Sequence, residues 1–421
     1  MPESPQFKAP TGTRDVMVPE AARWERLVSR FASHLEAAGY GLVLGPMFED
    51  VGVFVRGMGE STDVVRKEMY DFHDKGGRHL ALRPEGTASV VRCFVQHRPP
   101  PVWKAWYVTP AFRYERPQAG RLRQHHQLGA EALGSPDPDL DVEVVGLACR
   151  FLAGLGLERF SLRLGSMGDA ACRPAYVDEL SAWLAARAQE LCPEHRRRLG
   201  ANPLRVLDCK KPQCVSATAG APKLLERLCD ACRAHLDRVI DGLEALGQPF
   251  ELDPRLVRGL DYYTRTTFEL AGLALEGAQN ALGGGGRYDG LVEALGGPPT
   301  PGIGFSMGVE RLLLACDAEG VLAEEACGVD VFVVDLVGGG AARDLTFELR
   351  QAGIGADRAY DARTMRAQMR AAGRSGARVA AIVGPEEAAA GKVSLRPLAG
   401  EGDQQLVDRD SVAEALRRWL G

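Results

Sequence analysis

Positive charge is concentrated in the stretch Glu115–Glu131, ERPQAGRLRQHHQLGAE, although the whole chain has a net charge of −5. Like charges this close together are unfavourable unless an anion neutralises them, and planar guanidinium groups match phosphate oxygens. A solvated basic loop has the same composition, but polar residues in the flanking strands favour a lined pocket. We therefore expect phosphate binding by the arginines around this hairpin: Arg113, Arg116, Arg121 and Arg123.

Two adjacent histidines, His125 and His126, follow these arginines. Imidazole can bind a metal, exchange protons near neutral pH, or pack against other side chains. The hairpin residues alone leave all three uses open.

A carboxylate and two phenols stand in separate stretches. Glu85 is bracketed by Pro84 and Gly86, which presents it on a turn, where it suits a substrate ammonium group; the alternative is a turn with a solvated acid. In Leu256–Glu269, an arginine precedes a glycine and paired tyrosines follow on a β-prone run. A charge and a phenol can then share one face, although an ordinary strand with half-exposed aromatics gives the same pattern.

Glycines dominate two further stretches. Gly283–Gly286 precede Arg287 and Tyr288 and predict close approach of the backbone to a ligand. Gly302–Leu314 predicts a glycine-rich strand that turns into a helix with an arginine in its first turns. The chain has no GxxxxGKS/T motif and no strand–GxGxxG–helix unit, so neither common nucleotide-binding fold explains these phosphate-seeking features.

The composition is that of an ordinary globular protein of two or three domains, with 421 residues, 45% hydrophobic and 25% charged. No apolar run approaches the roughly 20 residues of a membrane span. The polar N-terminus lacks the apolar segment of a secretory signal. We therefore expect a cytoplasmic protein without membrane association, with its ten cysteines as reduced thiols.

The order of elements favours an α+β core with an antiparallel sheet, because strands and helices alternate without regular βαβ units. YGLVLGPMFED suits a proline-containing edge or interface strand. The periodicity predicts helices over residues 20–38 and 141–153, and strands over 79–82, 102–109, 127–132 and 160–165. Residues 168–250 are strongly helical, and 327–421 alternate as a separate α/β domain.

Taken together, these stretches resemble the class II aminoacyl-tRNA synthetases, and in detail the histidyl-tRNA synthetase family. FRYERPQAGRLRQHHQLGAE is similar to motif 2, GIGFSMGVERLLL to motif 3, and the GPMFED region to motif 1, the dimer-interface strand. RGLDYYTRTTFE and GGGGRYDGL resemble the two histidine-specific peptides. The resemblance implies a homodimer with a class II antiparallel-sheet catalytic core (1–167 and 251–326), a helical insertion (168–250) and a C-terminal anticodon-binding domain (327–421).

The resemblance also implies site residues. Contacts to L-histidine are expected from Glu85, Thr87, Gln127, Glu131, Arg258, Tyr262, Tyr263 and Tyr288. Contacts to ATP are expected from Arg113, Glu115, Arg121, Arg123, His125 and Arg311. The catalytic side chains are Arg113, Arg258 and Arg311, with no metal ligand among them, and Arg116 and Gln118 are expected near the acceptor end of tRNA(His).

The implied reaction is ATP-dependent ligation of L-histidine to tRNA(His) through a histidyl-adenylate, releasing AMP and diphosphate. Mg²⁺ accompanies ATP. Arg113 and Arg258 stabilise charge on the α-phosphate, so catalysis works by positioning and electrostatics. The family usually has an aromatic residue, most often phenylalanine, where this chain has His125, and that ring stacks on adenine. Imidazole stacks with less area and with a protonation state that matters, which leaves the effect on ATP binding open.

Two different functions are weighed against this one. A histidine-sensing regulatory relative generally lacks the C-terminal domain and some of the arginines, and another class II synthetase would lack RGLDYYTRT. This chain retains all of these features.

Residues 327–421 are neutral overall, with 13 Lys and Arg and 13 Asp and Glu. Four arginines nevertheless share one face of a predicted helix, which suits either phosphate contact or a solvated surface. They are Arg363, Arg366, Arg370 and Arg374.

The insertion is rich in cysteine, with Cys192 and His195 upstream of a C-x4-C-x14-C-x2-C pattern. That spacing resembles a structural zinc site. Its first pair is looser than the usual C-x2-C, and helical cysteines pack well as small apolar groups, so packing is the favoured interpretation. The candidate zinc ligands are Cys209, Cys214, Cys229 and Cys232.

Overall fold

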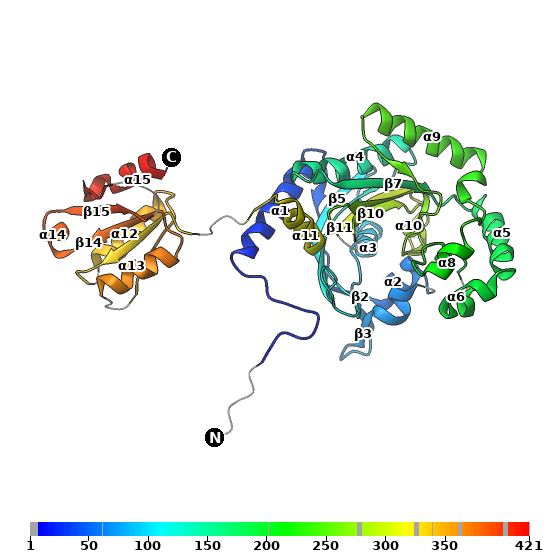
Figure 1. The fold of residues 1–421 in the computed structure, drawn as a ribbon, viewed down its shortest axis with the longest axis horizontal. Helices are drawn as coiled ribbons and strands as arrows, with labels where there is room; N and C mark the ends of the chain where they lie inside the picture. The colour runs from blue at the N-terminus through cyan, green and yellow to red at the C-terminus, as the bar shows by residue number, and fades with distance from the viewer. Residues whose placement is uncertain are drawn as a thin grey trace, which may run out of the picture. The chain divides into compact units, whose positions relative to one another are not determined.

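The computed structural model describes residues 7–60, 62–200, 202–275, 280–323, 328–338, 340–360, 364–398 and 403–420. The chain forms two compact units, Met1–Val16 with Arg23–Ala323, and Met17–Ala22 with Glu324–Gly421. Each unit has its own β-sheet (Figure 1). Among the described residues, no helix is long and apolar enough to cross a membrane.

The first unit is built on an eight-stranded sheet with the order β1-β5-β6-β11-β10-β9-β7-β8. The neighbours from β5 to β7 are all antiparallel, whereas the edge strands β1 and β8 pair in parallel. The predicted antiparallel α+β core is therefore confirmed. The strands are β1 (Gly41–Leu42), β5 (Trp103–Phe112), β6 (Gln124–Leu133), β7 (Phe160–Ser166), β8 (Glu251–Leu252), β9 (Thr264–Gly272), β10 (Ala281–Arg287) and β11 (Gly302–Gly308).

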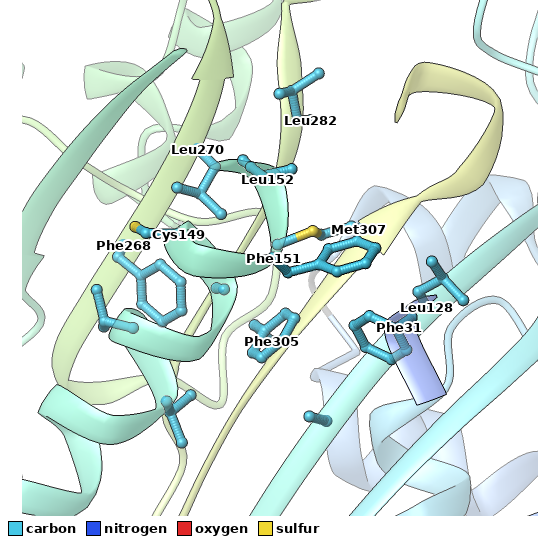
Figure 2. Packing of buried hydrophobic residues seen from close by; sticks show 14 of the residues in the cluster. Phe31, Leu128, Cys149, Phe151, Leu152, Phe268, Leu270, Leu282, Phe305 and Met307 are labelled. Atoms are coloured by element: carbon cyan, nitrogen blue, oxygen red, sulfur yellow. The ribbon is translucent and has the colours of Figure 1, made fainter. Parts of the chain in front are cut away.

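One face of this sheet carries the main hydrophobic core. Helices α1 (Glu20–Glu36), α4 (Pro138–Gly154), α9 (Asp230–Ala245) and α11 (Val309–Glu319) contribute to it. Leu27, Phe31 and Leu35 recur at helical spacing and bury one stripe of α1. Phe31 packs edge-to-face on Phe151 of α4, with ring centroids 4.9 Å apart, beside Phe305 of β11 (Figure 2).

Because side chains alternate along a strand, the residues between the core residues point to the opposite face of the sheet. In β6, Leu128, Ala130 and Ala132 belong to the core, so Gln127 and Glu131 point to the other side. In β11, the core takes Ile303, Phe305 and Met307, which leaves the intervening glycines and Ser306 for the other face.

An ion pair between Arg287 and Asp141 lies fully buried between β10 and α4. Arg287 Nε is 3.1 Å from Asp141 Oδ1. Asp141 Oδ2 also accepts from Thr266 Oγ1 at 2.6 Å and lies 2.7 Å from His235 Nε2. The carboxylate thus joins two strands to two helices.

A three-stranded sheet with the order β2-β4-β3 flanks the core. The edge strand expected in YGLVLGPMFED is present, but the expectation of one continuous strand is wrong, because the segment breaks around Pro46 into two edge strands. Its first half forms β1 of the large sheet, and its second half forms β2 of the small one. Proline has no N–H for a ladder, and the carbonyls of Gly45 and Pro46 instead accept from Arg83 Nη1, each at 3.1 Å. This layer comprises β2 (Phe48–Asp50), α2 (Val51–Met58), η1 (Val64–Glu68), β3 (Tyr70–His73), β4 (His79–Leu82), α3 (Thr87–His97) and α10 (Leu291–Ala294).

The described residues between β7 and β8 form helices and turns, as the sequence predicts. The elements before α9 pack around a small core of their own that includes Tyr176, Leu180 and Leu184, whereas α9 packs in the main core. The elements are α5 (Arg173–Ala185), η2 (Ala188–Glu190), α6 (Pro193–Arg198), α7 (Leu204–Leu207), α8 (Pro212–Ala217), η3 (Leu224–Glu226) and α9.

The second unit contains a five-stranded sheet with the order β13-β12-β14-β15-β16. Its first three strands are parallel and the last two antiparallel, and the predicted alternation of strands and helices is confirmed. The elements are β12 (Val331–Asp335), α12 (Gly340–Gln351), β13 (Ala356–Arg358), α13 (Met365–Arg374), β14 (Val379–Val383), α14 (Pro385–Ala389), β15 (Lys392–Pro397), β16 (Gln405–Asp408), η4 (Arg409–Ser411) and α15 (Val412–Leu420). In the predicted arginine stripe, Arg366, Arg370 and Arg374 are exposed on α13, and Arg363 lies outside the described residues.

Replacing Asp141 by Asn is expected to destabilise the first unit by about 3–5 kcal/mol, because it leaves the Arg287 charge buried without its partner. The midpoint of urea unfolding, followed by tryptophan fluorescence, measures this loss. The control is Asp139→Asn, two residues earlier, which removes an exposed ion pair with Arg238 and should change the midpoint little. Equal shifts in both variants would contradict the role of the buried pair.

Candidate active site

A cavity of about 250 Å³ opens on the sheet face opposite the main core. Its wall combines β6, β10 and β11 with the hairpin between β5 and β6 and with the segment before β9. The lining includes ten of the site residues expected from the sequence: Glu85, Arg113, Glu115, Arg121, His125, Gln127, Arg258, Tyr262, Tyr263 and Arg311.

Beneath the cavity, Glu131 is fully buried and accepts three hydroxyl hydrogen bonds. They come from Tyr288 at 2.6 Å, Thr87 at 2.7 Å and Tyr107 at 3.1 Å. Burial raises the pKa of Glu131 to about 8, while these hydroxyls act in the opposite direction. Thr87, Glu131 and Tyr288 therefore stand behind the residues that line the cavity, as a hydrogen-bonded group under its floor.

Glu85 is held on the turn that the sequence predicts, at the start of α3. Its two carboxylate oxygens accept from the backbone N–H groups of Thr87 and Ala88, each at 2.7 Å. Beside it, Gln127 Oε1 accepts from the backbone N–H of Gly86 at 3.0 Å. Burial raises the pKa of Glu85, and the helix-capping bonds and Arg113 act against that rise. A carboxylate fixed in this way can receive an ammonium group without reorganising.

Three arginines converge on the cavity from different elements. Arg113 Nε donates to Pro84 O at 2.8 Å, Arg258 Nη1 pairs with Glu269 Oε2 at 2.8 Å, and Arg311 Nη1 donates to Ala281 O at 2.8 Å. Burial lowers the pKa of both Arg113 and Arg311. Since guanidinium stays protonated, these charges are costly without an anion and suit a polyphosphate.

The hairpin before β6 holds the other predicted ATP and tRNA contacts. Arg121 forms an ion pair with Glu115, and the Arg123 guanidinium lies 4.0 Å from the centroid of the Tyr114 ring. Arg123 does not line the cavity, and Arg116 and Gln118 are exposed on the hairpin. The hairpin thus presents one set of side chains inward and another outward.

Gly283–Gly286, where we expected close approach of the backbone to a ligand, lie in the central strand β10, and Gly283 lines the cavity. A side chain at Gly284 would collide with the Arg258 guanidinium, at 2.8 Å from Nη2, and one at Gly286 with the Tyr263 ring, at 2.9 Å. Glycine is needed here so that residues of the segment before β9 can lie directly over the strand.

The two histidines of the hairpin have different surroundings. His126 packs edge-to-face on Trp24 and lies 3.0 Å from Glu310 Oε1, on the first turn of α11. His125 faces the cavity. Burial, followed by the nearby charges of Arg113 and Arg311, lowers the pKa of His125 to about 3. Its ring is therefore neutral at physiological pH, and neither histidine belongs to a metal-donor cluster found among the described residues.

The predicted set of four cysteines does not come together. Cys209 and Cys214 cluster with Cys192 and His195, whereas the other two cysteines cluster with Asp169 and Cys172. The linear spacing misleads because Cys229 and Cys232 lie at the start of α9, whereas Cys214 lies in α8.

Several functional neighbours were not identified from the sequence. Tyr107 reaches Glu131, and Ser306 and Glu310 line the cavity. Alternation gives a signal for Tyr107, because Ala105 pairs with Glu131 across the sheet and Tyr107 lies two residues further along the same face.

Comparison with known proteins agrees with this geometry. Residues 12–312 match the family described as histidyl-tRNA synthetase, and residues 330–419 match an anticodon-binding domain. The chain belongs to the histidyl-tRNA synthetase family. The histidine–tRNA ligase of Moorella thermoacetica is 49% identical over 97% of both chains, and that of Rhodococcus erythropolis is 47% identical over 99% of both. The crystal structure of apo S. aureus histidyl-tRNA synthetase, 34% identical, superposes with a TM-score of 0.82 over 98% of this chain and 100% of that one.

The protonation state of the His125 ring can be tested by NMR. In the free protein, its ring signals are expected to stay in the neutral form from pH 8 to 5, with the assignment made by their absence in His125→Phe. Because the folded pKa lies below the roughly 6.5 of an unfolded histidine, the unfolded chain binds more protons between these values. This residue should therefore cost stability as the pH falls below about 6.5. A titration midpoint near 6.5 for this ring would contradict its assigned surroundings.

Proposed function

We propose that this chain ligates L-histidine to tRNA(His) in two steps, through a histidyl-adenylate formed from ATP. The observation that carries the proposal is one cavity that joins three partly buried arginines to the carboxylate of Glu85 and the phenols of Tyr262 and Tyr263. The arginines suit triphosphate. The carboxylates and hydroxyls suit an amino acid with a polar ring, since a site built on hydrogen bonds rejects apolar analogues strongly.

For histidine, we assign the ammonium group to Glu85, Thr87 and Gln127. The preorganised Glu85 carboxylate supports this assignment, since both of its oxygens are already aligned by backbone donors. We assign the imidazole ring to Glu131, Tyr262, Tyr263 and Tyr288. A buried carboxylate and phenols can satisfy both ring nitrogens, one as acceptor and one as donor.

For ATP, we assign the α-phosphate to Arg113 and Arg258, and adenine with the γ-phosphate side to Arg311. Glu115, Arg121, Arg123 and His125 complete the nucleotide site, with the neutral His125 ring against adenine. The histidine carboxylate attacks the α-phosphorus, and diphosphate leaves. Arg113 and Arg258 stabilise the charge that develops on the phosphoryl oxygens, and no covalent enzyme intermediate forms.

Mg²⁺ bound to ATP would neutralise negative charge on the diphosphate. The cavity offers the carboxylate oxygens of Glu115 and Glu310, the donor type that this ion prefers. The positive guanidinium of Arg258 balances negative charge on the α-phosphate, and the side chain is held in a fixed position.

In the second step, the 3′-terminal adenosine hydroxyl of tRNA(His) attacks the adenylate carbonyl, and AMP leaves. We assign the exposed Arg116 and Gln118 to the acceptor end, and the arginine stripe on α13 to anticodon-stem phosphates. We further propose a cytoplasmic homodimer paired through the motif 1 region, and keep the domain bounds 1–167, 168–250, 251–326 and 327–421.

The test of the function is histidine-dependent exchange of diphosphate into ATP, followed by charging of tRNA(His). We expect exchange with L-histidine and none above background with the other amino acids. Exchange with a different amino acid would overturn the specificity alone. Absence of any exchange, with histidine binding still seen by calorimetry, would overturn the enzyme in favour of a histidine-sensing regulatory protein.

Replacing Arg258 by His is expected to lower the rate of adenylate formation by about 10²–10³-fold, because it removes a fixed charge used in the transition state. Histidine binding, measured by calorimetry, should weaken far less. Arg163→His is the matched control: Arg163 also approaches Glu269, at 3.9 Å, but does not line the cavity. An equal loss of binding and of adenylate formation in Arg258→His would contradict the assignment to the α-phosphate.

A further inference from the structure

Four metal-binding side chains meet in the insertion, outside the site described above. They are Cys192, His195, Cys209 and Cys214, and their donor atoms all lie within 4.8 Å of one another. Cys192 and Cys214 are fully buried, and the other two are partly buried. The four donors come from three places: the start of α6, the loop after α7, and α8.

The separations are close to those of a tetrahedral zinc site. His195 Nδ1 lies 3.2 Å from Cys192 Sγ and 3.9 Å from Cys214 Sγ. With Zn–S near 2.3 Å and Zn–N near 2.05 Å, tetrahedral geometry places such atoms about 3.6 Å apart. The backbone N–H of Cys192 also donates to Cys214 Sγ at 3.2 Å, a bond that stabilises a thiolate.

The segment around these four residues has few other stabilising features. The helices between Pro193 and Ala217 have only six, four and six residues, well below the length at which helices are stable alone. Cys192 and Cys214 are themselves part of the small core that these helices share. Small cores of this kind are commonly completed by a metal or a disulfide, and these cysteines are unpaired.

The neighbouring cluster of Asp169, Cys172, Cys229 and Cys232 is a weaker candidate. The Asp169 carboxylate already accepts from Ala171 N at 2.9 Å and pairs with Arg265 at 3.4 Å. Its role is therefore explained without an ion. The other cluster supplies three thiols and one imidazole, a standard donor set for structural zinc.

We propose that Cys192, His195, Cys209 and Cys214 bind one structural Zn²⁺ ion. The ion crosslinks α6 to the loop after α7 and to α8. The segment from His195 to Cys209, which it closes, includes α7.

The closed segment touches the loop that carries the proposed catalytic and histidine-binding residues. Arg205 donates to the carbonyl of Gly259 and lies 3.6 Å from Asp261 Oδ1, and Asn202 Nδ2 donates to the same oxygen at 3.2 Å. Gly259 follows Arg258, and Asp261 precedes Tyr262. The zinc site therefore acts as a support for this loop, a role that rests on the proposed function; the metal binding itself does not.

Elemental analysis of the full chain tests the metal, after expression with zinc in the medium, removal of any polyhistidine tag and dialysis without chelator. We expect about one zinc per chain, and less than about 0.2 in Cys214→Ser and Cys209→Ser. Cys229→Ser, in the neighbouring cluster, should keep this zinc. Absence of zinc from the wild-type chain, or its loss in Cys229→Ser with retention in Cys214→Ser, overturns the proposal.

A pair of substitutions at the partly exposed His195 separates metal binding from simple misfolding. His195→Ala should lose the ion, whereas His195→Cys should keep it with four thiolates. With Co²⁺ in place of Zn²⁺, His195→Cys should show stronger thiolate-to-cobalt charge-transfer absorption than the wild-type chain. Unchanged cobalt spectra in both variants would show that His195 is not a ligand.

The supporting role has its own readout in diphosphate exchange. His195→Ala should raise the KM for histidine by about fivefold or more, with little change in the KM for ATP, and His195→Cys should restore it. Zinc loss without a change in the KM for histidine would overturn the support and leave the metal site standing. Failure of exchange in the wild-type chain would overturn the proposed function without touching the metal result.

Discussion

The buried ion pair between Arg287 and Asp141 is the constraint around which the catalytic unit is arranged. Both charges are removed from water, so each is tolerated only because the other is held in place. Arg287 Nη1 and Nη2 also donate to the carbonyls of Ser135 and Asp137, which fixes the entry to α4. The helix layer and the end of β10 are thereby locked to one another.

The neighbouring residue transmits this constraint to the proposed histidine site. Tyr288 follows Arg287 directly, and its hydroxyl donates to Glu131 under the cavity floor. The backbone N–H of Tyr288 also donates to Gly302 O at 2.8 Å, so its ring is fixed against the start of β11. Arg287, which binds Asp141, and Tyr288, which binds Glu131, are adjacent in the chain. The two interactions therefore fix the same short piece of backbone. The position of the Tyr288 hydroxyl beside Glu131 is therefore determined by the packing of the core.

The sequence predicts local secondary structure well, because the periodicity of helices and the alternation of strands are visible among neighbouring residues. The helical stripe of α1, the paired strands β5 and β6 and the order of the second unit follow from such patterns. The hairpin arginines indicated phosphate binding through their side-chain chemistry, whereas RGLDYYTRT pointed to an amino-acid site only through its resemblance to a family peptide. The assigned roles of these residues remain predictions until variants are measured.

The misjudged features depend on contacts between distant parts of the chain. The four successive glycines are explained only by the fold, because a Cβ at Gly284 or Gly286 would lie 2.5 Å from a carbonyl oxygen of β9 and within 3 Å of Arg258 or Tyr263. The cysteine spacing suggested one set of four ligands, whereas the fold brings Cys192 and His195 to two of them and takes the other two elsewhere. Tyr107 was missed for a similar reason, since its partner Glu131 lies on another strand.

The contacts from α7 to Gly259 and Asp261 give the insertion a thermal consequence. Proteins open locally, and small units with few buried contacts open first. The short helices α6, α7 and α8 with their small core form such a unit, and α7 and its neighbour Asn202 hold the loop before β9. When this small unit opens on heating, that loop loses its external anchor while the eight-stranded sheet is still intact. We therefore expect the loop before β9 to lose order on heating before the first unit as a whole unfolds.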